Sequence, residues 1–140
     1  MPWDDLNPFL VGSGPTSTVL DPGANANTII EHPLGATVTT DWSFTGLLTI
    51  LLPNMQFAVS VYAESIGEGP EVLVGTVSVA GTAVPPPAQV AIAPASTLLL
   101  PPGPGISGVY KLTTVVTSTL LGTPFPVAGF VEGPIVQVRP

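Results

Sequence analysis

The sequence predicts an all-β protein, an antiparallel β-sandwich of short strands, and three observations lead to this prediction. Several segments alternate apolar and polar residues with a period of two. No segment combines helical periodicity with capping residues, and turn signals recur roughly every 8 to 12 residues, as in sandwiches. Between Glu71 and Lys111 there is no charged residue, and seven prolines interrupt that stretch. A jelly roll or a small barrel is the competing all-β solution.

The composition is that of one ordered domain with unusually little charge. The chain has 140 residues, of which 8% are charged and 45% are hydrophobic, and its mean hydropathy is +0.56. An average globular domain has roughly 25% charged residues, and disordered chains combine low hydrophobicity with high net charge. The 18 prolines and 15 glycines are therefore interpreted as turn punctuation.

Residues 1–27 are expected to form an irregular, extended N-terminal arm, because four prolines and three glycines break them. The one strand candidate there is Thr16–Leu20, which the turn signal Asp21-Pro22-Gly23 closes. Apolar side chains in this arm could dock on a neighbouring surface, namely those of Trp3, Phe9 and Leu10.

Residues 28–140 are expected to form a single β-sandwich domain. In the segment 36–45, one face carries Val38, Thr40, Trp42 and Phe44. The apolar run 47–52 predicts a strand buried on both faces, and residues 55–64 and 71–80 predict an antiparallel hairpin. Pro85-Pro86-Pro87 predicts a stiff crossing segment, and Gly133-Pro134 a bulge or turn. The remaining strands are expected at 28–32, 89–92, 97–100, 109–119, 125–131 and 135–138.

The stretch Gly108-Val109-Tyr110-Lys111-Leu112 resembles immunoglobulin-like domains, which carry a Gly-x-Tyr-x-Leu pattern at the start of their penultimate strand. The resemblance implies that the Tyr110 hydroxyl ties down the preceding corner and that Trp42 stands where the family buries a tryptophan. The paired cysteines of antibody domains are absent. The resemblance therefore implies a fold, and no activity.

The charge balance excludes several classes of partner. Nine acidic residues against two basic ones, Lys111 and Arg139, give a net charge of -7. Two cations cannot neutralise a run of phosphates, so no nucleic acid is expected, and binding to an anionic membrane surface is disfavoured. The longest uncharged windows contain Pro53-Asn54 or Gly122, Pro124 and Pro126, so hairpins are expected there, with no membrane span.

The absence of cysteine excludes disulfides and thiolate sites, and no signal peptide is visible at the N-terminus. The compartment stays open, with a virion or an extracellular assembly favoured. No catalytic, cofactor-binding or metal-binding residue is assigned. His32, the only histidine, has no second histidine or cysteine to complete a zinc set. Glu64, Glu68 and Glu71 gather on one expected hairpin loop, and whether they bind a cation is left open.

These observations favour a non-enzymatic structural protein, a subunit that self-assembles or coats a larger particle or filament. Eleven charged residues are few for covering a monomer of 140 residues, so apolar surface is expected to be buried between copies or in a larger protein assembly. The alternative is an immunoglobulin-like module that binds a protein or glycan through loops 65–70 and 101–105. A hydrolase would need a pocket that brings carboxylates and His32 together.

Overall fold

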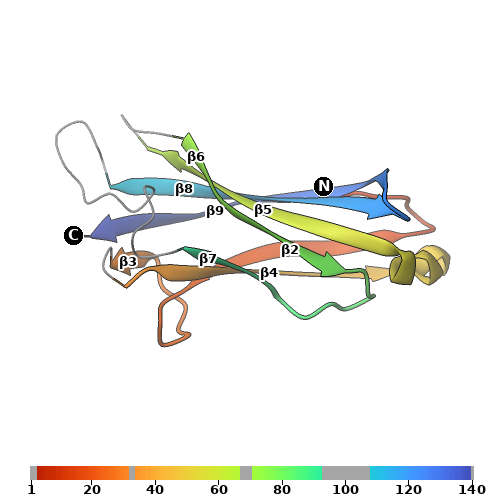
Figure 1. The fold of residues 1–140 in the computed structure, drawn as a ribbon, viewed down its shortest axis with the longest axis horizontal. Helices are drawn as coiled ribbons and strands as arrows, with labels where there is room; N and C mark the ends of the chain where they lie inside the picture. Colours follow the sequence, from red (N-terminus) through yellow and green to blue (C-terminus); the bar gives the residue numbers. More distant parts are fainter. Residues whose placement is uncertain (1–2, 32–33, 67–70, 93–107, 140) are drawn as a thin grey trace.

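The computed structural model describes residues 3–31, 34–66, 71–92 and 108–139, which form two sheets packed face to face (Figure 1). The larger sheet has the order β1-β9-β8-β5-β6, with the short β3 paired in parallel to β9. The smaller sheet has the order β2-β4-β7, and all its pairs are antiparallel. The all-β sandwich predicted from the sequence is confirmed.

The bounds of most strands agree with the period-two segments. The larger sheet contains β1 (Trp3–Asp4), β3 (Ile29–Glu31), β5 (Met55–Ser65), β6 (Glu71–Ala80), β8 (Val109–Leu120) and β9 (Thr123–Arg139). The smaller sheet contains β2 (Val11–Leu20), β4 (Ala36–Thr45) and β7 (Ala88–Ile92). The predicted β5–β6 hairpin is confirmed as an antiparallel pair. The strand expected at 97–100 lies outside the described residues.

The core lies between the sheets and is filled from alternate positions of the strands. Strand β4 buries Val38, Thr40, Trp42 and Phe44, the face that the sequence predicts. Thr40 is tolerated there because its hydroxyl lies 3.2 Å from the Ser17 hydroxyl, which also donates to Thr114 Oγ1 at 3.0 Å. This chain of hydroxyls links the two sheets, since β2 and β4 belong to one and β8 to the other.

The N-terminal segment differs from the expected irregular arm. Residues 11–20 form a ten-residue strand that pairs with β4 over nearly its whole length, and Trp3–Asp4 pair with β9. The prolines do not prevent this, because Pro15 falls at the register shift between Ser13 and Thr16 on a strand at the edge of its sheet. In this structure residues 3–20 are part of the sandwich.

The prediction of a buried strand at 47–52 is wrong. Residues Leu47–Asn54 form a 3₁₀ helix, η1, which connects the two sheets between β4 and β5. A short, uniformly apolar run does not distinguish strand from helix by its periodicity. The backbone of Gly46, with φ 117° and ψ 174°, turns the chain out of β4 at a conformation that is essentially restricted to glycine.

The last segment is one long strand. Strand β9 runs from Thr123 to Arg139, and Gly133-Pro134 lies at a register shift opposite the Lys111–Thr113 stretch of β8. The bulge, one of the two expected readings of Gly133-Pro134, is therefore confirmed. The segment 81–87 crosses from β6 in the larger sheet to β7 in the smaller one, as the proline run predicts.

Candidate interaction surfaces

The acidic residues expected at the β5–β6 hairpin are only partly brought together. Glu64 and Glu71 are cross-strand partners, and Glu64 Oε2 lies 3.7 Å from Lys111 Nζ. Both side chains of this ion pair are substantially exposed, so it contributes at most about 1 kcal/mol. Glu68 and His32 lie outside the described residues, and no group of three potential metal ligands occurs within the described ones. Whether this hairpin binds a cation stays open.

The described residues line several hollows, among them a small apolar void. Asp21 and Glu31 line a hollow of about 290 Å³ together with apolar and backbone groups. Two further hollows of about 350 Å³ each are lined by small polar and apolar residues without a carboxylate. The hydrolase hypothesis needs His32 as well, so it stays untested. No helix among the described residues is long and apolar enough to cross a membrane.

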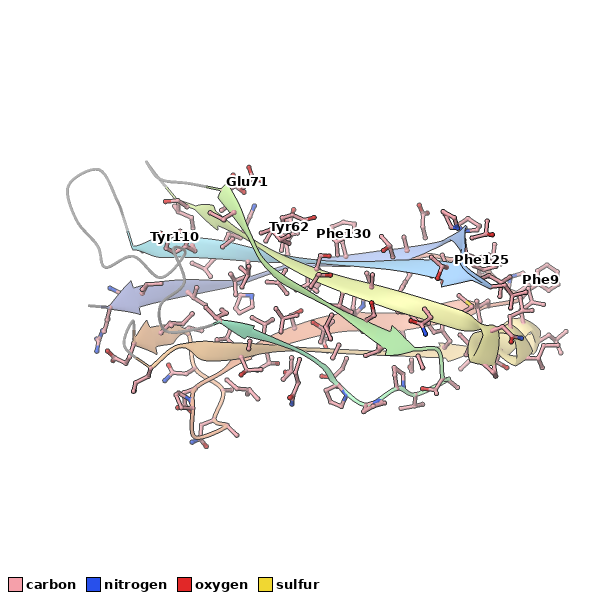
Figure 2. The ribbon with its side chains drawn as sticks, in the orientation of Figure 1. Phe9, Tyr62, Glu71, Tyr110, Phe125 and Phe130 are labelled. Carbon is pink, nitrogen blue, oxygen red and sulfur yellow. The ribbon has the colours of Figure 1, made fainter. Side chains whose placement is uncertain are left out.

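One end of the sandwich exposes large apolar side chains from three separate segments. We define the apolar cap as Phe9, Leu47, Ile50 and Leu121, which are 55%, 79%, 75% and 78% exposed. Figure 1 shows η1 at the right-hand end of the molecule, and Figure 2 shows Phe9 at the same end. Because β4 ends and β5 begins at η1, and β8 ends at Leu120, the loops around these side chains meet at this end.

Backbone hydrogen bonds hold the three segments of the cap together. The Leu48 amide donates to the Phe9 carbonyl at 2.9 Å, and the Leu121 amide donates to the Asn54 carbonyl at 3.0 Å. These hydrogen bonds fix the three segments of the cap relative to one another. The position of the cap is set by the ends of the strands beneath it.

The layer below the cap is continuous with the core. Leu48, Leu51, Leu120 and Phe125 are partly buried and pack on the core cluster that contains both tryptophans. A helix that is apolar on all sides is normally buried, yet Leu52 is the only fully buried residue of η1. The cap is therefore an apolar surface that continues the hydrophobic core but is exposed to solvent.

Charged residues gather at the opposite end of the sandwich. The loops of the cap, residues 6–10, 46–54 and 120–126, contain none. The carboxylate nearest along the chain, Asp5, accepts hydrogen bonds from the amides of Asn7 and Gly12. Six charged residues lie at or next to the ends of strands at the end of the sandwich opposite η1, namely Asp21, Glu31, Glu64, Glu71, Lys111 and Arg139. The molecule therefore has one charged end and one apolar end.

A second exposed surface is the outer face and edge of the larger sheet. Tyr62 of β5 and its cross-strand partner Leu73 of β6 are 38% and 50% exposed, and Phe130 of β9 is exposed on the same face. Figure 2 shows Tyr62 and Phe130 on the same side of the sheet. Strand β6 lies at the end of the strand order, so no described strand pairs with its second edge.

Sequence reasoning missed the apolar cap. The signal was present in Leu-Leu-Thr-Ile-Leu-Leu-Pro, a run with no polar position except Thr49. By itself the run predicts a doubly buried strand, whereas the exposure of Leu47 and Ile50 follows from its 3₁₀ conformation. The proximity of Leu47 and Ile50 to Phe9 and Leu121 depends on contacts between segments that are distant in the sequence. No pattern within one segment predicts such contacts.

The resemblance to immunoglobulin-like domains implies that the Tyr110 hydroxyl bonds to the corner that precedes its strand. The Tyr110 ring is buried, and its hydroxyl has no hydrogen-bond partner within the described part of the chain. Burial raises the pKa of the Tyr110 phenol. The ring lines the small apolar void together with Ile30, Leu112 and Val136. The residues that precede this strand, 93–107, lie outside the described ones.

Replacing Tyr110 by phenylalanine is expected to change the free energy of unfolding by less than about 0.5 kcal/mol, because the buried hydroxyl has no hydrogen-bond partner among the described residues. Urea unfolding of both proteins, followed by tryptophan fluorescence, measures this. A loss of about 1–3 kcal/mol would instead show that the hydroxyl makes a buried hydrogen bond, as in a tyrosine corner.

Comparison with protein-family models, with curated proteins and with solved structures finds no match to this chain. Functional inference therefore depends on the surfaces themselves.

Proposed function

We propose that this chain is a non-enzymatic structural subunit that associates with copies of itself through the apolar cap, as part of a larger assembly such as a filament or a particle. The observation that carries this proposal is the exposure of the four cap side chains, three of them above 70%. The largest exposed apolar patch on a protein is often a site of interaction with a partner.

The size of the cap suits a contact between proteins. Its exposed surface is on the order of 500 Å², near the upper end of the roughly 300–600 Å² of the largest patch on a typical monomer. Each partner in a standard protein interface contributes about 800 Å². The partly buried Leu48 and Leu51 would add to the contact.

The charge distribution favours a second copy as the partner. Each chain carries a net charge of -7, so two copies repel one another in most orientations. A contact between two caps places the charged ends far apart and sets no charged loop residue against another. The same absence of Lys and Arg at the cap offers nothing to an anionic surface.

The wild-type protein is expected to elute from size-exclusion chromatography with a mass, by light scattering, of at least twice 14.2 kDa. The double variant Leu47→Asp/Ile50→Asp is expected to lose this association by at least tenfold, because two carboxylates per copy would have to be desolvated in the contact. Both changes are at highly exposed positions, so circular dichroism and the melting temperature should change little.

The matched control is Leu34→Asp/Ile135→Asp. It adds the same charge at two exposed apolar residues outside the cap, which are 60% and 54% exposed. This control is expected to keep the mass of the wild type. A 14.2 kDa wild-type monomer at high concentration, or an equal effect of the two double variants, would contradict the proposal.

We further propose that the sandwich is immunoglobulin-like, and the strand order supports this. Labelled by that family's convention, β5, β8 and β9 correspond to strands C, F and G, with β6 as C′, and β2, β4 and β7 correspond to A, B and E. Tyr110 then stands at the start of strand F, as the resemblance implies.

Trp42 departs from that pattern. It lies on β4, the counterpart of strand B, whereas the family's tryptophan lies on strand C. The buried aromatic residue of β5 is Phe57. The alternative function, ligand recognition by loops 65–70 and 101–105, falls largely outside the described residues and stays a prediction.

A further inference from the structure

We propose that the free edge of β6 pairs with β6 of a second copy, antiparallel about a two-fold axis, so that the larger sheet continues from one copy into the next. This contact is separate from the apolar cap. It uses the edge of the larger sheet, whereas the cap is formed by loops at the end of the sandwich.

The second half of strand β6 lacks the features that normally protect an edge strand. The strand is ten residues long, and after Glu71 it contains no charged residue and no proline. Edge strands of natural proteins are usually short, or carry Lys, Pro or a bulge to prevent pairing with another chain. The other border of the larger sheet is different, because β1 and β3 cover part of the edge of β9.

A bulge protects only the first half of β6. The register between β5 and β6 shifts at Val61/Tyr62, opposite Leu73–Gly75. At Gly75 the two sheets approach closely, since a Cβ there would lie 2.9 Å from Val90 Cγ1. From Thr76 to Ala80 the pairing with β5 is regular. The stretch that can accept another strand is therefore Thr76–Ala80.

The inward side chains of this stretch are incompletely covered. Val77 and Val79 pack on the core clusters but are only partly buried, and no residue of β6 is fully buried. The outward residues Thr76, Ser78 and Ala80 are exposed. A strand added at this edge would cover the open side of both valines, which are only partly buried in one copy.

The residues themselves point to a second copy as the occupant. In an antiparallel pair centred on Ser78, Val77 faces Val79 of the second copy on the inner side of the sheet. On the outer side Ser78 faces its own counterpart, and Thr76 faces Ala80. Valine is thus paired with valine on the inner side, small residues face one another on the outer side, and no charge opposes another. The stretch is self-complementary under a two-fold axis.

Two different self-contacts on one subunit produce growth instead of a closed dimer. If the cap joins one pair of copies and β6 joins the next pair, the assembly lengthens by alternating contacts. This step rests on the proposed function of the cap. The β6 contact itself does not depend on it.

The test introduces one cysteine into a chain that has none, so any disulfide formed is between copies. In the background Leu47→Asp/Ile50→Asp, which blocks the cap, Ser78→Cys is expected to give a covalent dimer under mild oxidation on a non-reducing gel. Directly opposed residues in antiparallel strands have Cα atoms about 4.5–5.5 Å apart, within reach of a disulfide.

The matched control is Thr117→Cys in the same background. Thr117 is exposed on the same outer face, and both Thr117 and Ser78 are paired with Ala58 of β5, but Thr117 lies on β8, away from the edge. Cross-linking through Ser78→Cys at least fivefold faster than through Thr117→Cys supports the proposal. Equal cross-linking of the two variants overturns it.

A second variant separates failure of this contact from failure of the cap. Ser78→Lys places two like charges opposite each other at the axis, so with an intact cap it is expected to stop growth at the dimer held by the caps. If the cap proposal fails and the β6 contact holds, the wild type is a dimer that Leu47→Asp/Ile50→Asp leaves intact and Ser78→Lys converts to a monomer. A mass unchanged by Ser78→Lys contradicts the β6 contact.

Discussion

Replacing Trp3 by alanine is expected to lower the free energy of unfolding by about 3–5 kcal/mol, the range for a buried tryptophan. Trp3 is only 3% exposed although it stands almost at the N-terminus. Its ring lies 4.9 Å from that of Phe44 and 6.3 Å from that of Trp42, centroid to centroid. Removal of the indole would leave a cavity in the core cluster under the apolar cap.

Gly12 and Gly129 leave the space that the Trp3 indole occupies. A Cβ added at Gly12 or at Gly129 would lie 2.6 Å from a ring carbon of Trp3, so only glycine allows β2 and β9 to approach the ring. The indole Nε1 of Trp3 has no hydrogen-bond partner among the described residues, which is unfavourable. The packing of the ring is expected to outweigh it.

Urea unfolding, followed by circular dichroism, measures the effect of Trp3→Ala. The control is Phe9→Ala, which removes an aromatic ring from the same N-terminal segment at a position 55% exposed, and a loss below about 1 kcal/mol is expected for it. If residues 1–27 behaved as a loose arm, both variants would be equally mild. That outcome would contradict the docked β1.

Replacing Gly46 by alanine is expected to destabilise the protein by about 3 kcal/mol or more, for two reasons that add. The φ of 117° with ψ of 174° is a region that costs other residues about 1–3 kcal/mol. The added Cβ would also meet the backbone of Phe9, whose carbonyl carbon would be 2.7 Å away. Backbone cannot move aside as a side chain does, so the loop 6–10 would have to shift.

The comparison variant is Gly122→Ala. Gly122 also has a positive φ, 82°, but an added Cβ would meet nothing within 4 Å, so about 1–2 kcal/mol is expected. The difference between the two variants in urea midpoint isolates the clash with Phe9. Gly46→Ala is also expected to weaken self-association, because Gly46 sets η1 against the loop that carries Phe9. Equal stabilities of the two variants would contradict this account.

The strands were predictable where burial alternates along the chain. In residues 36–45 and 55–64 the alternation of apolar and polar side chains predicts which face is buried, because one face of each strand packs on the core. The bulge at Gly133-Pro134 was predictable for a similar reason, since proline and glycine have few places in a strand. The conformation of the run 47–52 was not predictable, because a segment that is apolar at every position except Thr49 shows neither a helical nor a strand period.

The sequence by itself determined the class of the fold, the β5–β6 hairpin and the scarcity of charge, because period-two alternation, turn signals and composition are local properties of the chain. Only the tertiary structure decided that Trp3 belongs to the core, that residues 47–54 form a 3₁₀ helix and that Phe9, Leu47, Ile50 and Leu121 share one surface. These outcomes depend on contacts between segments from opposite parts of the chain. Trp3 fits because Gly129 has no side chain, and a pattern read within one segment does not contain that relation.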